Sequence, residues 1–175
     1  MRKNSTLSVT LLSLLPTLFS AATSADGRFA PVAALKADLV QVDKSKRRMY
    51  LLEQGRVIRE FRIALGKSPK GHKVQEGDQR TPEGRYYLDY VSEQSGFYRS
   101  MNISYPNQQD LRRAESMGVN PGGAIKIHGL KQGFDGRPEY IQSFDWTNGC
   151  IALTNREMDE FLSLVDSGTP IDIEW

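Results

Sequence analysis

Residues 147–155 read TNGCIALTN and contain Cys150, the only cysteine in the chain of 175 residues. A short polar turn with a glycine comes before an apolar run, which predicts a tight turn that leads into a buried β-strand. Upstream, residues 125–129 read IKIHG, a second apolar run that ends at His128 and Gly129. The sequence therefore places a cysteine and a histidine 22 residues apart, each beside a glycine at one end of a predicted strand.

Further short runs rich in Val, Ile, Tyr and Phe surround these two stretches, and polar turns separate them. Together the predicted strands cover residues 39–42, 47–53, 56–65, 85–92, 101–106, 124–129, 147–153 and 171–175. Gln54-Gly55 fits a two-residue hairpin turn, because glycine adopts a positive φ easily. We therefore expect a mainly β fold, a sandwich or an open barrel, with two or three peripheral helices.

Two helices are predicted between the strands. Residues 108–117 form the first, which Gly118 ends. Thr154 and Glu157 have the S/T-x-x-E spacing of a capping box, which predicts the start of the second helix. The apolar residues that follow share one helix face and are expected to lie in the core: Met158, Phe161, Leu162 and Val165.

Two long segments rich in glycine and charge remain, at residues 66–84 and 130–145. Loops of this length in a small domain are usually functional, and we expect the second to form a flap. His72 lies in the first loop, and the simplest expectation is a solvated side chain.

The first residues predict export. Residues 1–25 have Arg2 and Lys3, an apolar run and then small residues, which is typical of a secretory signal peptide cleaved after Ala22 or Ala25. The run is too short for a membrane anchor. We expect a linker at residues 26–37, one domain at residues 38–175, and a periplasmic location.

The charge of the predicted mature chain is balanced. Without residues 1–25 it has 21 Lys and Arg against 21 Asp and Glu. A neutral chain gives no indication of binding to nucleic acid or to a membrane surface.

A single cysteine in an exported protein has three explanations. It is a buried small hydrophobic residue, half of an intermolecular disulfide, or a nucleophile that needs a histidine as base. We expect no metal site, because one cysteine and two distant histidines do not form a ligand cluster.

The chemistry of the third explanation requires Cys150 and His128 to meet. An imidazole near a thiol stabilises the thiolate and can carry a proton to a leaving amine. The Gly129 carbonyl is a candidate acceptor that would fix the tautomer of the imidazole. The amides around Gly149 and Cys150 could stabilise an oxyanion.

The two motifs together resemble the L,D-transpeptidase catalytic domain of bacterial peptidoglycan enzymes, whose signature is HG, a variable loop and then S/T-x-G-C. Residues 42–67 resemble the opening hairpins of that family, and residues 71–88 resemble its segment with T-P-x-G. The resemblance covers about residues 38–175. It implies a β-sandwich with the cysteine in a cleft under a flap, Cys150 as nucleophile, His128 as general base and Gly129 as the residue that orients it.

Two positions depart from the family pattern. Asn148 stands where many members have a second histidine, and Ala152 stands where many have an arginine. An asparagine cannot act as a base, but its amide can donate a hydrogen bond to an oxyanion or to substrate. The choice of acceptor is therefore open.

Several other residues are candidates for contact with substrate or oxyanion. Within the signature these are Thr147, Asn148 and Gly149. Elsewhere they are Arg80, whose fork suits carboxylates, and Tyr105, Lys126 and Trp146, each of which could instead be structural.

The resemblance implies attack on the third residue of a peptidoglycan stem peptide, loss of terminal D-Ala, and transfer of the acyl group to an amine, without a cofactor. A D-amino acid or a wall-linked protein could be the acceptor. Two alternatives stay open. The same site could hydrolyse its substrate, as an L,D-carboxypeptidase or as an amidase that releases wall-linked protein, or the domain could bind the wall without catalysis.

Overall fold

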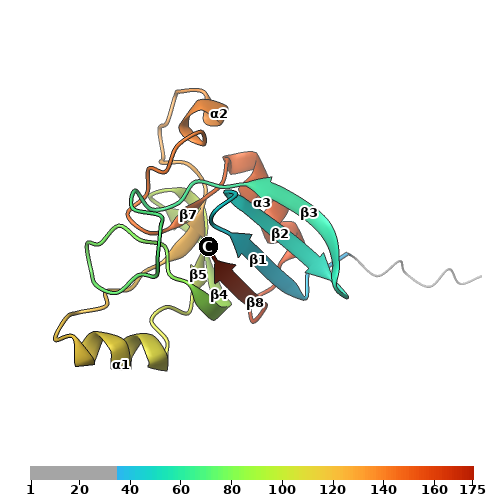
Figure 1. The fold of residues 1–175 in the computed structure, drawn as a ribbon. Coiled ribbons are helices and arrows are strands. Elements are labelled where there is room, and N and C mark those ends of the chain that lie inside the picture. The colour runs from blue at the N-terminus through green and yellow to red at the C-terminus, as the bar shows by residue number, and fades with distance from the viewer. Residues whose placement is uncertain (1–34) are drawn as a thin grey trace, which may run out of the picture. The chain divides into compact units, whose positions relative to one another are not determined.

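The computed structural model describes residues 35–175, so the predicted signal peptide and most of the predicted linker lie outside the described residues. Eight strands and three helices follow one another along the chain (Figure 1). The strands are β1 (Leu39–Asp43), β2 (Arg48–Glu53), β3 (Arg56–Arg62), β4 (Gly84–Ser95), β5 (Tyr98–Ile103), β6 (Lys126–His128), β7 (Ile151–Ala152) and β8 (Pro170–Glu174). The helices are α1 (Gln108–Ser116), α2 (Pro138–Ile141) and α3 (Asn155–Leu164). The prediction of a mainly β fold with two or three helices is confirmed.

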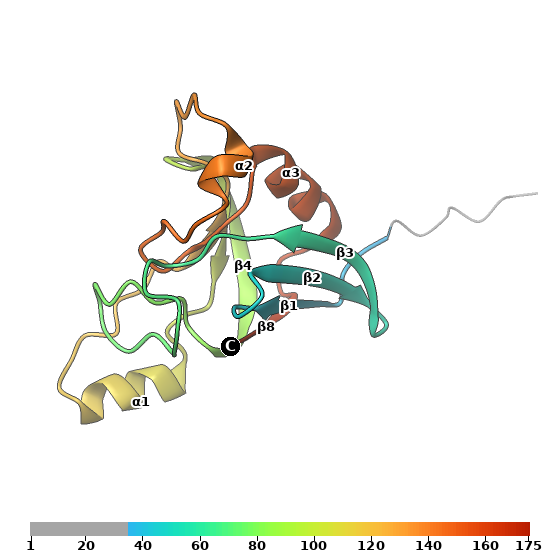
Figure 2. The same ribbon diagram turned by 45° about the horizontal axis from the view of Figure 1, so that its top comes forward.

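All eight strands belong to one open sheet with the order β3-β2-β1-β8-β4-β5-β6-β7. Strand β4 joins its two halves, because residues 84–87 pair with β8 while residues 88–95 pair with β5. The pairing of β4 with β5 has two register shifts, which is how a long strand bends from one half to the other. Figure 2 shows the half with β1, β2, β3 and β8 turned away from the rest of β4.

The chain after β3 crosses to the far edge of the sheet. Ala64 forms an isolated antiparallel bridge with Ala152 of β7, and Gly66 forms a parallel bridge with Thr147. Residues 64–67 therefore run beside the turn that carries Cys150, although more than 80 residues separate the two segments in the sequence. This crossing places Lys67 next to the predicted site.

The core lies between the two halves of the sheet and α3. Inward residues alternate along the strands, as in β1, where Val40 and Val42 are almost fully buried. From α3 and its C-terminal end, Met158, Phe161 and Val165 are buried as predicted, and Leu162 is partly buried and packs against the core.

The predicted capping box at the start of α3 is present. The hydroxyl of Thr154 accepts a hydrogen bond from the backbone N–H of Glu157 at 3.3 Å, and the Glu157 carboxylate accepts one from the Thr154 N–H at 3.0 Å. Such reciprocal caps satisfy two otherwise unpaired N–H groups and fix the entry to a helix. Since only two residues separate β7 from α3, the cap also holds the C-terminal end of β7 in place.

A buried lysine, Lys44, anchors the long loop at residues 66–84. Lys44 is fully buried, and its ammonium group donates to the carbonyls of Gly71 (2.9 Å) and Thr81 (2.8 Å) and to the carboxylate of Glu83 (2.9 Å). A buried ammonium is tolerated when each N–H has a partner. The loop is therefore tied to the β1–β2 turn at both of its ends.

His72 is not solvated, so that expectation is wrong. Its Nδ1 accepts a hydrogen bond from the Glu83 N–H at 3.0 Å, and its Nε2 lies 2.9 Å from the carboxylate of Asp110 in α1. Burial lowers the pKa of His72, although the negative charge of Asp110 opposes this. The sequence of the loop alone could not reveal this contact, because Asp110 comes 38 residues later.

The segment at residues 130–145, expected to be a flap, is an excursion that contains the short helix α2. In both ribbon views α2 lies at the opposite end of the described domain from α1 (Figures 1 and 2). Within residues 35–175, the structure has no helix with the length and apolar character needed to cross a membrane.

Candidate functional site

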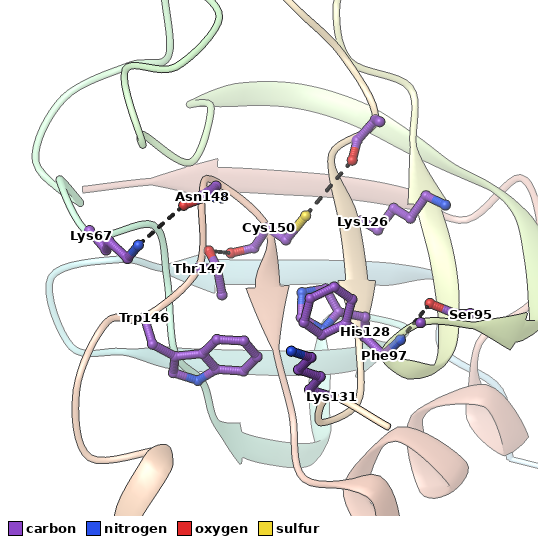
Figure 3. Close-up of a pocket in the computed structure, with 12 residues that line it drawn as sticks. Lys67, Ser95, Phe97, Lys126, His128, Lys131, Trp146, Thr147, Asn148 and Cys150 are labelled. Atoms are coloured by element: carbon purple, nitrogen blue, oxygen red, sulfur yellow. Dashed lines mark hydrogen bonds between the residues drawn. The ribbon is translucent and has the colours of Figure 1, made fainter. Parts of the chain in front are cut away.

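Strands β6 and β7 bring the two motifs of the sequence together. They pair in parallel, with Ile127 opposite Ile151 and His128 opposite Ala152. Side chains alternate between the faces of a sheet, so Cys150, just before β7, faces the same side as His128, while Ile127 and Ile151 point into the core. Figure 3 shows the thiol of Cys150 and the imidazole of His128 in one cleft.

The hydrogen bonding of His128 determines which nitrogen can act as a base. Its Nδ1 lies 2.6 Å from the backbone oxygen of Gly129, and because a carbonyl only accepts, Nδ1 must carry the proton. In the neutral imidazole, Nε2 is therefore the basic nitrogen. This is the contact that the resemblance implied for Gly129.

Close packing explains why a glycine follows His128. A Cβ on Gly129 would lie 2.7 Å from Oδ1 of Asn155 and 2.9 Å from Cβ of Tyr98. The side-chain oxygen of Asn155 also accepts a hydrogen bond from the N–H of Leu130 at 2.8 Å. Asn155, the last residue of TNGCIALTN, thus holds the segment after His128, a role that the sequence analysis missed.

Aromatic side chains enclose the imidazole. The ring of Phe97 lies 4.6 Å from that of His128 between centroids, and the ring of Trp146 lies 5.7 Å away in an edge-on arrangement. His128 is only 4% exposed. This burial lowers the pKa of His128, and the positive charge of Lys126 adds to the effect, while the bond to Gly129 opposes it. The neutral imidazole is therefore the form present near pH 7.

The thiol of Cys150 is also largely withdrawn from water. Burial raises its pKa, and the backbone N–H of Lys126 and the charges of Lys126 and Lys73 offset this only in part. The sulfur lies 3.8 Å from the backbone oxygen of Ala124, to which the thiol donates a weak hydrogen bond. Burial therefore favours the neutral thiol over the thiolate in the resting site.

The turn before Cys150 depends on Thr147 and Gly149. The hydroxyl of Thr147 donates to the Cys150 carbonyl at 2.7 Å and accepts from the N–H of Gly149 at 3.1 Å. The Gly149 amide, one of the oxyanion donors considered from the sequence, therefore already has a partner. This leaves the backbone N–H of Cys150 and the side chain of Asn148 as candidate oxyanion donors in the turn.

The cleft has a volume of about 620 Å³. Four of the residues proposed from the sequence line it together with Cys150 and His128: Lys126, Trp146, Thr147 and Asn148. A second hollow of about 360 Å³ shares Asn148 with the first, and Gly122, Gly123 and Ile125 are among its lining residues.

Apart from the two glycines, Gly129 and Gly149, two of the proposed residues do not line the cleft. Tyr105 is buried, and its hydroxyl donates to the Pro121 carbonyl at 3.1 Å. The Arg80 side chain lies along the loop and donates to the His72 carbonyl at 3.4 Å. The structure thus gives both side chains packing roles beside the site.

Phe97, Lys67 and Lys131 line the cleft but were not among the residues proposed from the sequence. Phe97 lies in the β4–β5 turn and Lys67 in the segment that crosses from β3. Of these three residues, only Lys131 lies close to a motif in the sequence, since it follows His128 by three residues.

Ala152, where many family members have arginine, is fully buried. Its N–H donates to the Ala64 carbonyl at 2.9 Å, and its carbonyl accepts from the side chain of Gln142 at 2.8 Å. Because Ala152 is fully buried, the packing around it leaves no room for an arginine side chain without rearrangement. Any cationic contact to substrate must therefore come from elsewhere in the cleft.

Replacing Gly149 with alanine is expected to lower the free energy of unfolding by about 2–4 kcal/mol and to displace Cys150. Gly149 has a φ of 128°, and its Cβ would lie 2.7 Å from the backbone oxygen of Arg80. The measurements are chemical denaturation and the rate of Cys150 alkylation. Gly168→Ala is the control, since Gly168 has a φ of 91° but no atom within 4 Å of its Cβ position. Equal losses in both variants would show that φ alone, and not the contact with Arg80, matters.

Comparison with known proteins agrees with this architecture. Residues 37–173 match the family model of the L,D-transpeptidase catalytic domain, YkuD. YafK of Escherichia coli strain K12, provisionally named an L,D-transpeptidase, is 26% identical over 132 residues, which are 72% of this chain and 46% of YafK. The chain thus spans about half the length of the curated relatives it matches.

Solved structures show the same fold. The helical cell shape determining protein Pgp2 from Campylobacter jejuni is 29% identical, with a TM-score of 0.59 over 78% of this chain and 46% of Pgp2. A cysteine-to-serine mutant of the Enterococcus faecium L,D-transpeptidase has a TM-score of 0.52 at 18% identity, over 80% of this chain and 50% of that one. On the family match, which covers most of the chain, this protein belongs to the L,D-transpeptidase catalytic domain family.

Proposed function

We propose that this protein is a cysteine acyltransferase that acts on peptidoglycan stem peptides, with L,D-transpeptidase activity. The observation that carries the proposal is the shared cleft of Cys150 and His128, in which the bond from Nδ1 to Gly129 leaves Nε2 as the basic nitrogen. Membership of the family supplies the substrate class.

In the first step, Nε2 of His128 removes the thiol proton as Sγ of Cys150 attacks the carbonyl carbon of the third stem residue. The electron pair of the carbonyl moves to its oxygen. Collapse of this intermediate breaks the C–N bond to the terminal D-Ala, whose nitrogen takes the proton from Nε2. A thioester on Cys150 remains, and the base is neutral again.

In the second step, an acceptor amine loses a proton to Nε2 and attacks the thioester carbon. The C–S bond breaks, and the sulfur recovers the proton from Nε2. Water in place of the amine gives hydrolysis by the same route. The two outcomes differ only in which nucleophile reaches the thioester.

The developing negative charge needs donors. We propose the backbone N–H of Cys150 and the side-chain amide of Asn148 for this role. The ammonium group of Lys67 lies 3.4 Å from Oδ1 of Asn148, which orients the amide so that its NH₂ group is the part free to donate.

Two features support transfer over hydrolysis. The imidazole lies under Phe97 and Trp146, which limits the access of water to Nε2. The second hollow, which shares Asn148 with the main cleft, offers space for an acceptor peptide while the donor occupies the main cleft.

The location of the reaction is part of the proposal. Peptidoglycan lies outside the cytoplasmic membrane, so this activity requires export, which agrees with the signal peptide predicted at residues 1–25. Thr147, Lys126 and Trp146 are proposed to contact the substrate, because they line the cleft around Cys150.

The test is the fate of the acyl-enzyme. Purified protein is incubated with a tetrapeptide muropeptide and a D-amino acid, and the products are identified by mass spectrometry. Exchange of the terminal D-Ala or formation of dimers supports transfer, and tripeptide alone shows that the site hydrolyses. If the protein neither releases D-Ala nor forms a covalent adduct with an acylating carbapenem, the enzymatic proposal is contradicted. That outcome would favour a wall-binding module.

A further inference from the structure

The cleft around Cys150 has an unbalanced charge. Lys67, Lys126 and Lys131 line it, and none of its lining residues is acidic. The chain as a whole has nearly equal numbers of basic and acidic residues, 23 and 21. A concave surface with charges of one sign concentrates ligands of the opposite sign.

These lysines have no acidic partner within residues 35–175. The nearby arginines differ, since Arg47 pairs with Asp145 at 2.8 Å and Arg99 pairs with Glu93 at 2.6 Å. The only side-chain contact of the three ammonium groups is the long one from Lys67 to Asn148, at 3.4 Å. Their charges are therefore available to a bound ligand.

The three lysines line the cleft on different sides of Cys150 and His128. Figure 3 shows Lys67 beside Asn148, Lys126 on the opposite side of Cys150, and Lys131 next to His128. Lys126 directly precedes Ile127, which pairs with Ile151, so its backbone lies opposite that of Cys150. The positive charge of Lys126 lowers the pKa of both Cys150 and His128.

The position of the thioester indicates which part of the substrate meets these charges. The third stem residue is bonded to Sγ after the first step, so its side chain stays in the cleft when D-Ala has left. A diamino acid in this position either has a second carboxylate, has that group as an amide, or lacks it. A free carboxylate on this side chain adds a negative charge that stays in the cleft after D-Ala has left, whereas the other two forms add none there.

We infer that Lys67, Lys126 and Lys131 recognise a free side-chain carboxylate on the third stem residue, so that the protein selects such stems over amidated ones. This inference rests on the proposed function and names its substrate more narrowly. The lysines also supply the cationic contact that the buried Ala152 cannot provide.

The experiment compares two soluble tetrapeptide stems that differ only in this group, carboxylate or primary amide. The measurement is kcat/KM for release of D-Ala at low and high salt. A single exposed charge pair contributes up to about fivefold, and three together are expected to give a preference of roughly tenfold or more for the acid. High salt is expected to reduce the preference.

Lys→Met variants at positions 67, 126 and 131 keep the length of the side chain and remove its charge. Each is expected to lower kcat/KM by a larger factor for the acid than for the amide, because Lys67 and Lys126 also act on Asn148, Cys150 and His128, and the triple variant is expected to lose the preference. Lys70→Met is the matched control, because Lys70 is an exposed lysine outside the cleft. Equal turnover of the two stems by the unmodified protein would overturn the inference and leave the proposed function intact, whereas turnover of neither stem would overturn both.

Discussion

Cys150→Ala is expected to abolish release of D-Ala from stem tetrapeptides, with kcat/KM falling by at least ~10⁴-fold. The chain has no other cysteine, and alanine cannot form the thioester. The measurement is D-Ala release, followed together with the mass of the intact protein after exposure to an acylating carbapenem. The unmodified protein is expected to gain one adduct, and the variant none.

The fold of this variant should be unchanged, which makes the result interpretable. The thiol has one weak hydrogen bond, at 3.8 Å to the Ala124 carbonyl, and it lines an open cleft. The free energy of unfolding is expected to change by less than about 1 kcal/mol. A folded Cys150→Ala protein that still released D-Ala would show that another group is the nucleophile. Muropeptide binding that persists in the variant, with no adduct on the unmodified protein, would support the wall-binding alternative.

Local sequence patterns predicted the elements of the fold well. The capping box joins Thr154 and Glu157, which are three residues apart, so a local sequence pattern is enough to predict its contacts. The helix predicted at residues 108–117 is present as α1, and a second capping box, between Asn107 and Asp110, starts it. Short runs rich in Val, Ile, Tyr and Phe between polar turns likewise predicted the strands.

Contacts between distant segments could not be predicted in the same way. Tyr105 looked like a candidate for substrate contact because it lies at the end of a predicted strand near the site. In the structure its ring packs edge-on against Tyr86, with 6.0 Å between the centroids, and burial raises its pKa. The bend of β4, which decides what its neighbours bury, has no local signal in the sequence.

In the candidate site too, local motifs could be predicted and contacts between distant segments could not. The two motifs identified Cys150 and His128, because HG and T-x-G-C each require a particular backbone, as the close contacts of Gly129 and Gly149 show. Phe97 and Lys67 reach the cleft only because β4 bends and because the chain crosses after β3. Phe97 and Lys67 were therefore outside what the sequence could predict, whereas Trp146 and Lys126, which also line the cleft, were candidates from it.

His128→Gln is expected to reduce kcat/KM by at least about 100-fold and to remove the acidic limb of its pH profile. In the unmodified protein, kcat/KM requires the neutral imidazole, so it rises with pH through the pKa of His128. Burial and the charge of Lys126 lower this pKa, so the rise is expected below pH ~6.5 and a plateau near pH 7. Glutamine cannot take the thiol proton, so the variant has no such limb.

Alkylation of Cys150 by iodoacetamide tests the same assignment without a substrate. The pKa of the free thiol is raised by burial, so alkylation near pH 7 depends on transfer of the proton to Nε2 of His128. In His128→Gln, alkylation at pH 7 is expected to slow at least tenfold. The pH at which the alkylation rate rises is expected to move toward the raised pKa of the thiol.

Phe97→Ala is the companion variant, because exposing the imidazole to water should raise the pKa of His128 and shift the acidic limb of kcat/KM to higher pH, while the base itself is kept. An unchanged alkylation rate at pH 7 in a folded His128→Gln protein would mean that His128 is not the base.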